Sequence, residues 1–461
     1  MHLAASAEPV DRSHARTELA WSGDCGHAAP RIPTVSVSFV SLPMGLMRMS
    51  RRNRWRGAWA GGLLSACVLA AGIVPGAIAQ TPARTQATGC ILDAAGAAQA
   101  GPDCAAAWID RNLRLNDVQA IGTHNSYKLA IAPDELAALR ARDPAGADAL
   151  DYAHAPLHEQ LELGMRSLEL DVYYDPNGGR YAHPPGALGQ GYGDIGPWNR
   201  EVAARMQRPG FKVMHLADID FRSQCMVFVQ CLEQIRAWSQ THRDHAPILI
   251  LINAKDGKGG AGSTSPLPFD GRAFDALDAE IRSVFAADEL ITPDRVRGDA
   301  ATLRAAVLAG RWPTLAQSRG KLLFALDEDA RKVAAYRGKR RSLEGRAMFV
   351  SGDENATDAA YLTLNDPIAQ GERIARAVAA GFLVRTRADA DTVEARRNDP
   401  RRREAAFASG AQFISTDYPK PDLRLSRYRV TFPRSEVVRC NPRRAPERCG
   451  QRAIEAAEKH D

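Results

Sequence analysis

The sequence predicts an α/β protein whose strands and helices alternate to form a (β/α)8 barrel of the TIM type. Short apolar, β-branched runs that end in polar residues recur eight times along the 461-residue chain. Stretches with helical spacing follow several of these runs, and such alternation is typical of a parallel sheet. No internal repeat or long linker divides residues 105–425, which favours one barrel domain over two smaller domains.

The predicted strands lie between residues 118 and 417. In chain order they are Val118–His124, Met165–Tyr174, Phe211–Asp218, Pro247–Asp256, Lys321–Asp327, Arg346–Gly352, Gly381–Asp389 and Ala411–Asp417. The predicted helices are Leu157–Gly164, Cys231–His242, Phe274–Phe285, Ile368–Ala380 and Arg402–Ser409. An open doubly wound sheet is the alternative. That fold usually has a glycine-rich phosphate loop after its first strand, and IGTHNSY at residues 121–127 is not one.

Residues 44–79 have the layout of a cleavable secretory signal peptide. Five arginines between residues 48 and 56 precede an apolar run at residues 58–73, and Ala77-Ile78-Ala79 forms a small-residue cleavage site. An uncleaved membrane anchor is the alternative. Residues 1–43 form an upstream extension without an interpretable pattern. We therefore expect a secreted or periplasmic protein in which residues 80–461 are a single barrel domain with a disulfide-bearing C-terminal extension.

The net charge of +6 does not indicate a nucleic-acid partner. Without residues 1–79, which hold eight arginines and four acidic residues, the net charge is about +2. The arginine cluster at residues 396–403 has acidic residues on both sides, unlike the concentrated basic patch of a nucleic-acid-binding surface. We expect a monomer without a nucleic-acid partner.

The cysteine count of the predicted mature chain is even, as expected for an exported protein with disulfides. The six cysteines are Cys90, Cys104, Cys225, Cys231, Cys440 and Cys449. They fall into three local couples, so sequential pairing is the simplest of the 15 possible connectivities. A zinc site is the alternative, but no Cys-x-x-Cys or nearby Cys/His spacing favours it.

Polar side chains gather at the ends of the predicted strands, where the active site of a barrel of this kind lies. They are His124, Asn125, Glu169, Asp171, His215, Asp218, Asn253, Lys255, Asp256, Asp327, Arg385, Arg387 and Asp417. Two histidines, several carboxylates and several cations are more polar groups than a purely structural rim needs. The sequence therefore predicts a catalytic site at this rim.

The pair Glu169 and Asp171 in LELDVYY predicts a cation site. On a strand, residues two apart point to one face, and the apolar face carries Leu168, Leu170 and Val172, so both carboxylates point into the barrel. Adjacent carboxylates repel each other unless a cation lies between them, and Ca²⁺ or Mg²⁺ prefers oxygen ligands. The alternative is a solvent-facing strand end whose carboxylates pair with arginines.

His124 and His215 predict acid/base chemistry on a phosphodiester. One imidazole removes a proton from the attacking oxygen and the other protonates the leaving oxygen, while a metal offsets the phosphoryl charge. His183 in GGRYAHPPG competes with His215 as the second histidine. His215 is favoured because it ends a strand-like run, whereas residues 183–209 read as a long Gly/Pro-rich loop.

Six segments in order, IGTHNSY, LGMRSLELDVYY, FKVMHLADIDFRSQC, HAPILILINAKDG, LVRTRADAD and SGAQFISTDYP, resemble the bacterial calcium-dependent phosphatidylinositol-specific phospholipase C family. The resemblance runs from about Val118 to about Cys449. It implies that a hydroxyl of the inositol headgroup attacks phosphorus and that diacylglycerol leaves. The implied partner is a phospholipid or another phospho-alcohol diester, with transient contact to a membrane surface for which Trp198 is a candidate.

The resemblance also implies roles for individual residues. His124 and His215 become the acid/base pair, and Asn125, Glu169 and Asp171 become ligands of Ca²⁺. Eukaryotic relatives have a glutamate as a further ligand at the position of Asn253, so this chain has one negative charge fewer there unless Asp256 or water compensates. The implied contacts to the substrate phosphate or headgroup are Lys255, Arg387 and Asp417.

Two other functions stay open from the sequence. A glycerophosphodiester phosphodiesterase shares the barrel and the Glu-x-Asp pair, but it typically has His-Arg-Gly where this chain has His124-Asn125-Ser126. A secreted binding protein on a degenerate barrel is the second alternative, and Asn253 in place of a ligand carboxylate favours it.

Overall fold

The computed structural model describes residues 102–187, 194–257, 263–434, 436–445, 448–449 and 454–456. These residues belong to a compact unit formed by residues 86–461. The predicted upstream extension at residues 1–43 and the predicted signal peptide at residues 44–79 lie outside the described residues. Within the described part, no helix is both long and apolar enough to span a bilayer.

The described strands form two sheets. The strands are β1 Val118–Thr123, β2 Ser167–Tyr173, β3 Lys212–Val213, β4 Ile248–Ala254, β5 Leu322–Leu326, β6 Met348–Val350, β7 Tyr361–Thr363, β8 Leu383–Arg387, β9 Phe413–Thr416, β10 Glu436–Cys440 and β11 Glu455–Ala456. One sheet has the order β11-β10-β1-β9-β8-β7, and the other has the order β3-β2-β4-β5-β6.

Two seams join the sheets into a ring of eight parallel strands. At one seam, Ser351 after β6 forms a parallel bridge with Tyr361 of β7. At the other, the Arg166 amide before β2 donates to the Ile121 carbonyl of β1 at 2.8 Å. The ring order β1-β2-β4-β5-β6-β7-β8-β9 is that of a (β/α)8 barrel, which confirms the predicted fold class.

Gly122 makes the seam between β1 and β2 possible. A Cβ atom on Gly122 would lie 2.1 Å from the carbonyl oxygen and 2.4 Å from the Cβ atom of Ser167. Since no side chain fits there, only glycine lets the two strand backbones approach this closely. The strand ends that carry His124 and Glu169 are therefore held side by side.

The structure corrects the predicted third strand, Phe211–Asp218. Only Lys212 and Val213 form a strand, β3, and it pairs antiparallel with the end of β2 at the sheet edge. The inserted loop before β3 returns the chain against the direction of β2, so β3 is not a strand of the parallel ring. The ring instead includes β7, a strand of three residues that is too short to give a recognisable apolar run.

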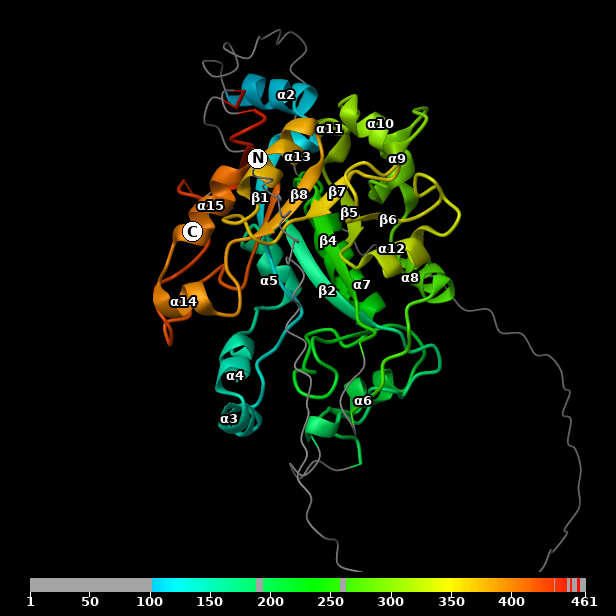
Figure 1. Cartoon of the computed structure of the whole chain (residues 1–461), viewed down its shortest axis with the longest axis vertical. Helices are drawn as coiled ribbons and strands as arrows, with labels where there is room; N and C mark the ends of the chain where they lie inside the picture. Colours follow the sequence, from blue (N-terminus) through cyan, green and yellow to red (C-terminus); the bar gives the residue numbers. More distant parts are fainter. Residues whose placement is uncertain are drawn as a thin grey trace, which may run out of the picture. The chain divides into compact units, whose positions relative to one another are not determined.

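The described helices are α2 Pro102–Asn112, α3 Pro133–Arg142, α4 Pro144–Leu150, α5 Leu157–Glu162, α6 Arg200–Met206, α7 Phe228–Thr241, α8 Gly271–Val284, α9 Pro293–Arg297, α10 Leu303–Leu308, α11 Leu315–Ser318, α12 Ala330–Arg337, α13 Gly371–Ala380, α14 Val393–Arg397 and α15 Arg401–Ser409. Most of them surround the ring, whereas α3, α4 and α6 lie below it in the view of Figure 1. The five helices predicted from the sequence are confirmed as α5, α7, α8, α13 and α15, each within three residues at either end.

The strands are buried on both faces, as a closed parallel sheet requires. In β4, every residue from Ile248 to Ile252 is at most 1% exposed. A second, smaller cluster packs Tyr181, Trp198 and Phe221 beyond the barrel. Trp198 is 9% exposed, lies edge-on to Phe221 and donates its indole N–H to the Ala182 carbonyl at 2.7 Å. Trp198 is therefore a core residue and not the exposed membrane contact that the sequence suggested.

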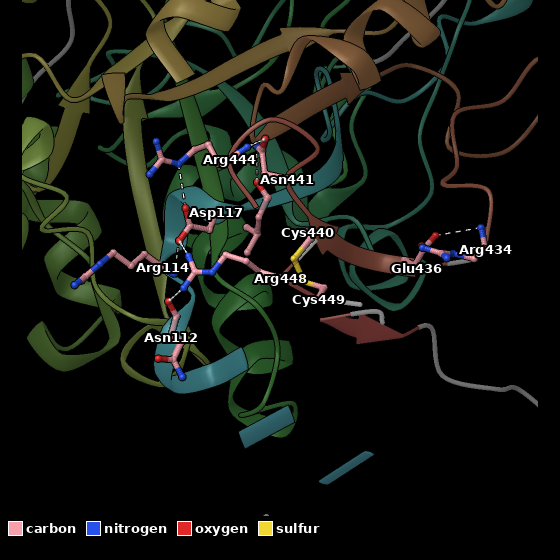
Figure 2. Close-up of a disulfide and its surroundings, with 11 residues drawn as sticks. Asn112, Arg114, Asp117, Arg434, Glu436, Cys440, Asn441, Arg444, Arg448 and Cys449 are labelled. Carbon is pink, nitrogen blue, oxygen red and sulfur yellow. Dashed lines mark hydrogen bonds and ion pairs between the residues drawn. A yellow bond between two sulfur atoms is a disulfide. The ribbon is translucent and has the colours of Figure 1, made fainter. Parts of the chain in front are cut away.

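The C-terminal extension packs onto the β1 side of the seam (Figure 2). Strand β10 pairs antiparallel with β1, and a disulfide joins Cys440 to Cys449. Glu455 of β11 pairs with the Arg166 guanidinium and accepts the Ala246 amide at 2.7 Å. The extension thus ties β1, β2 and β4 together. A second disulfide joins Cys225 to Cys231, so two predicted pairs are confirmed, while Cys90 of the third lies outside the described residues.

Candidate active site

His124 follows β1 directly and has a partner on each ring nitrogen. Its Nδ1 atom lies 2.9 Å from Oδ1 of Asp417, and the Arg387 guanidinium donates toward its Nε2 atom at 3.4 Å. A carboxylate only accepts and a guanidinium only donates, so these partners assign the proton to Nδ1 and a lone pair to Nε2. His124 is therefore set as a neutral imidazole with a basic Nε2.

The surroundings of His124 oppose its protonation. Burial lowers the pKa of His124 well below 6.5, and the Arg387 charge lowers it further, while Glu169 acts in the opposite direction. His215 also contributes to lowering this pKa, which places the two imidazoles in one electrostatic environment. An imidazole that stays neutral is suited to accept a proton.

Asp417 follows β9 and is 4% exposed. Its Oδ1 atom faces His124 and its Oδ2 atom accepts from Arg387 at 3.2 Å. The backbone amide of Asp417 donates to Asp389 at 2.8 Å, and burial raises the pKa of Asp389 to about 7, with the Asp417 charge adding to the effect. Because both Asp417 oxygens are engaged inside the protein, this geometry does not support the predicted headgroup contact for Asp417.

His215 lies just beyond β3, and its Nδ1 atom is 2.9 Å from Oδ2 of Asp220. The side chain of His215 is 18% exposed, whereas that of Asp220 is fully buried. The short β3 strand carries His215 to the site because it extends from the end of β2. The competing His183 is exposed and lines a separate hollow with Ile195 and Trp198.

Two residues of the segment after α4, Tyr152 and His154, contact His124. The Tyr152 hydroxyl lies 3.3 Å from Nδ1 of His124 and accepts from the Asn125 amide at 2.9 Å. His154 donates through Nε2 to the His124 carbonyl at 2.7 Å. Burial raises the pKa of Tyr152 well above 10, and the Asp417 charge raises it further. The Tyr152 hydroxyl therefore stays protonated.

Glu169 and Asp171 both point into the barrel, as predicted from the alternation along β2. Glu169 is 5% and Asp171 is 1% exposed. Glu169 pairs with the buried Arg385 from β8, and Asp171 lies 2.8 Å from the Lys255 ammonium. Burial lowers the pKa of Lys255, but the Asp171 charge, its hydrogen bond to the ammonium and the nearby glutamates together outweigh burial, and the pKa rises. The two carboxylates are thus balanced by two cations inside the site.

Four oxygen-bearing side chains from three neighbouring strand ends form a donor set that fits Ca²⁺. Asn125 follows β1 with a φ of 46°, a left-handed conformation that asparagine tolerates better than most residues. Asp171 of β2 and Asn253 of β4 are register partners, and Glu169 lies two residues before Asp171. Carboxylate and amide oxygens are the ligands that Ca²⁺ prefers.

Three details limit this donor set. Among the described residues, no three His, Cys, Asp or Glu side chains gather closely enough to hold a metal by themselves, so the amides of Asn125 and Asn253 have to contribute. Asp256 does not replace the missing carboxylate, because it is bound by Arg331 at 2.8 Å and Lys332 at 2.9 Å. The Lys255 ammonium beside Asp171 would also have to move for Ca²⁺ to bind both carboxylates.

Sequence reasoning missed several residues of the site, namely Lys128, Tyr152, His154, Asp220 and Asp389. Tyr152 and His154 lie in an irregular segment without periodicity. Asp220 lies in the irregular segment that follows β3, several residues after its last residue Val213, so no strand pattern includes it. Asp389 is the exception, because it ends the predicted run Gly381–Asp389 and could have been included.

The family described as "Phosphoinositide phospholipase C, Ca2+-dependent" matches residues 113–442, which is most of the chain and includes every residue of the candidate site. The chain belongs to this family. It is therefore an enzyme of the phosphoinositide phospholipase C type, and its two His–Asp pairs lie within the matched region. No match was found among curated proteins.

The solved structures to which this chain is similar include two that are described as calcium-dependent phospholipases C. One is a calcium-dependent phosphoinositol-specific phospholipase C from a Pseudomonas species, in an apo form with myoinositol, with 16% identity, a TM-score of 0.41 and coverage of 67% of this chain and 91% of the other. Another is the calcium-dependent phosphatidylinositol-specific phospholipase C of Streptomyces antibioticus, with 19% identity, a TM-score of 0.40 and coverage of 66% and 95%.

Proposed function

We propose that this phospholipase C-like enzyme cleaves the glycerol–phosphate bond of a phosphoinositide with His124 and His215 as the acid/base pair. The observation that carries the proposal is the matched arrangement of the two imidazoles. Each has its Nδ1 atom 2.9 Å from a buried aspartate, Asp417 for His124 and Asp220 for His215. A carboxylate on Nδ1 orients the ring and leaves Nε2 for proton transfer.

The reaction follows from the charges around the two rings. Nε2 of His124 takes the proton of a headgroup hydroxyl, whose oxygen then bonds to phosphorus. The bond between phosphorus and the glycerol oxygen breaks, and a His215 ring that carries a proton on each nitrogen gives its Nε2 proton to that oxygen, so diacylglycerol leaves as an alcohol and His215 is left neutral. The Arg387 guanidinium 3.4 Å from Nε2 of His124 favours a neutral ring before the reaction, which suits the base.

Calcium is the proposed cofactor, held by Asn125, Glu169, Asp171 and Asn253. When bound there, Ca²⁺ would offset negative charge that develops on the phosphoryl oxygens. Lys255 and Arg387 are the proposed contacts to the substrate phosphate and headgroup, because both cations border the two carboxylates and His124. The oxygen donor set of three strand ends supports this assignment.

A substrate panel tests the proposal. Turnover of phosphatidylinositol, phosphatidylcholine and glycerophosphoinositol is measured with Ca²⁺ and with a chelator. We expect Ca²⁺-dependent release of diacylglycerol from phosphatidylinositol only, and a loss of roughly 10²–10⁴-fold in His124→Ala. Preference for glycerophosphoinositol would identify a glycerophosphodiester phosphodiesterase. Full activity of His124→Ala would contradict the acid/base assignment, and insensitivity to the chelator would contradict only the calcium part.

We also propose that the enzyme is exported through the signal peptide at residues 44–79. The small-residue site Ala77-Ile78-Ala79 supports cleavage, and the disulfides Cys225–Cys231 and Cys440–Cys449 agree with an oxidising compartment. Mass spectrometry of the protein from the periplasm and the medium tests this proposal. The expected mature chain begins at Gln80, whereas an intact chain in the membrane fraction would identify an anchor.

A further inference from the structure

Lys128 is a fully buried lysine directly after the segment that carries His124. Its ammonium lies 3.2 Å from Oδ1 of Asp220, the carboxylate whose Oδ2 atom faces His215. The same ammonium donates to the Tyr152 carbonyl at 2.7 Å and toward the Leu129 carbonyl at 3.3 Å. Lys128 is therefore shielded from solvent and is separated from a proposed catalytic imidazole by one carboxylate.

The backbone around Lys128 also connects the two histidine segments. Lys128 and Ser223 form an antiparallel bridge, and the Gln224 amide donates to the Tyr127 carbonyl at 2.9 Å. On the other side, the Leu129 amide donates to the Arg222 carbonyl at 3.2 Å. The turn that carries His215 and Asp220 is thus fastened to the loop after β1 at the residue whose ammonium holds Asp220.

A buried ammonium is costly unless it is paired and hydrogen-bonded. The carbonyls of Tyr152 and Leu129 fix the ammonium on one side, so the Asp220 carboxylate is held on the other. Without this cation, the His215 ring would be the one remaining side-chain partner of the Asp220 carboxylate among the described residues, and the carboxylate would be free to rotate. The position of the His215 ring then depends on Lys128.

We propose that Lys128 is a positioning residue for His215 and acts through Asp220. The role rests on the proposed function, in which His215 protonates the leaving oxygen. It goes beyond that function because the Lys128 ammonium contacts none of the proposed calcium-ligand side chains, although the Lys128 amide donates to the Asn125 carbonyl at 2.9 Å. The Asp220 carboxylate transmits the effect. The Lys128 ammonium holds Oδ1 of Asp220, and Oδ2 of Asp220 holds Nδ1 of His215, so that Nε2 of His215 faces the site.

Lys212 provides a matched control within the same chain. It is also fully buried, lies 3.1 Å from Asp175 and donates to the carbonyls of Arg208 and Gly210 at 2.7 and 2.9 Å. The two lysines thus have the same burial, one aspartate and two carbonyls each, but Asp175 holds no histidine. Lys212→Met shows what the loss of a buried ammonium alone does to the protein. Lys128→Met has the same loss, so any additional change in it reports the effect on His215.

The first measurement is the nitrogen NMR signal of the His215 ring in protein labelled at histidine, assigned with His215→Gln. At a pH where the His215 ring is neutral, we expect Lys212→Met to leave it as in the wild type, with its one proton on Nδ1. Lys128→Met should shift the ring to a mixture of the two tautomers, and Lys128→Arg should restore the wild-type state. An unchanged His215 signal in folded Lys128→Met would overturn the proposal. This readout does not depend on activity, so it stands even if the proposed substrate is wrong.

The second measurement is a double-mutant cycle between Lys128→Met and His215→Ala. Displacing a catalytic group by about 1 Å costs on the order of 10²-fold, so Lys128→Met should lower kcat by about 10- to 100-fold in the wild-type background. In His215→Ala it should lower kcat by less than about threefold. Equal losses in both backgrounds would mean that Lys128 acts independently of His215, against the proposal. Wild-type activity of His215→Ala would instead contradict the proposed function.

Discussion

Nδ1 of His124 lies 2.9 Å from Oδ1 of Asp417, and the other oxygen of the same carboxylate accepts from Arg387. One buried aspartate therefore fixes both the base and the cation beside it. Asp417→Asn removes the charge that holds Nδ1–H and presents an amide that can donate to the ring. We expect kcat to fall by roughly 10²–10⁴-fold with an almost unchanged melting temperature. A loss of less than threefold would contradict the role of Asp417.

Because His124 is the proposed base and His215 the proposed acid, the loss of activity in each variant should depend on the leaving group of the substrate. An alkoxide needs a proton to leave, whereas a nitrophenolate does not. His215→Ala should lose about 10²–10⁴-fold in kcat on phosphatidylinositol but much less on a nitrophenyl ester of inositol phosphate. His124→Ala should lose activity on both substrates because the attacking hydroxyl still needs a base. The opposite pattern would exchange the two roles.

Lys255 predicts a competition for Asp171. Its ammonium lies 2.8 Å from Oδ2 of Asp171, so Ca²⁺ and the ammonium share one carboxylate. Lys255→Met should tighten Ca²⁺ binding by about tenfold, since removing a nearby like charge favours a cation, while kcat falls if the ammonium contacts the substrate phosphate. Calorimetry with Ca²⁺ alone measures the first effect. Arg331→Met, which removes a cation from Asp256 instead, should leave Ca²⁺ affinity unchanged.

The Cys440–Cys449 disulfide predicts a local contribution to stability. It closes a loop with a sequence separation of 9, which corresponds to about 2–3 kcal/mol of unfolding free energy in the chain-entropy model. Cys440→Ser with Cys449→Ser should lower the free energy of unfolding by this amount in urea titrations. The Ca²⁺ affinity should stay unchanged because the disulfide lies at the start of β1, away from the rim. No loss of stability would mean that β10 is held by its strand pairing alone.

His245 predicts acid sensitivity of the fold. Burial lowers its pKa from 6.5 to about 4, and its ring bonds Ser239 and the Ala246 carbonyl, both at 2.7 Å. The unfolded chain takes up a proton at this histidine near pH 6.5, but the folded chain resists it down to about pH 4. The stabilisation is therefore complete above pH 6.5 and is lost as the pH falls toward 4, on the order of 3 kcal/mol. His245→Gln should flatten this part of the curve of stability against pH.

Much of the fold is predictable from the sequence because a closed parallel barrel leaves strong local signals. The apolar run of β4 and the alternation along β2 both follow from burial. The errors concern β3 and β7, which have two and three residues. Such short strands are fixed by their neighbours, through Tyr173 for β3 and Ser351 for β7, and not by their own residues.

The site residues also divide into those that regular strands make predictable and those that contacts between distant segments bring together. Glu169 and Asp171 lie within the regular strand β2 and His124 follows β1 directly, so periodicity alone indicates where their side chains point. Lys128 and Asp220 meet only because the loop after β1 pairs with the segment after His215. Such a pairing between distant irregular segments has no signature in a single sequence, and it therefore became visible only in the structure.

The strand pairing of the C-terminal extension has a consequence for biosynthesis. Glu455 binds Arg166 at the start of β2, so β1 and β2 are held together by a residue that is translated 289 positions after Arg166. Contacts of such long sequence separation form late in folding. We expect a nascent chain released after residue 430 to be cut by protease within β1 and β2, while the complete chain resists. The rim that carries the two histidines would then be completed only after the C-terminal extension has been synthesised.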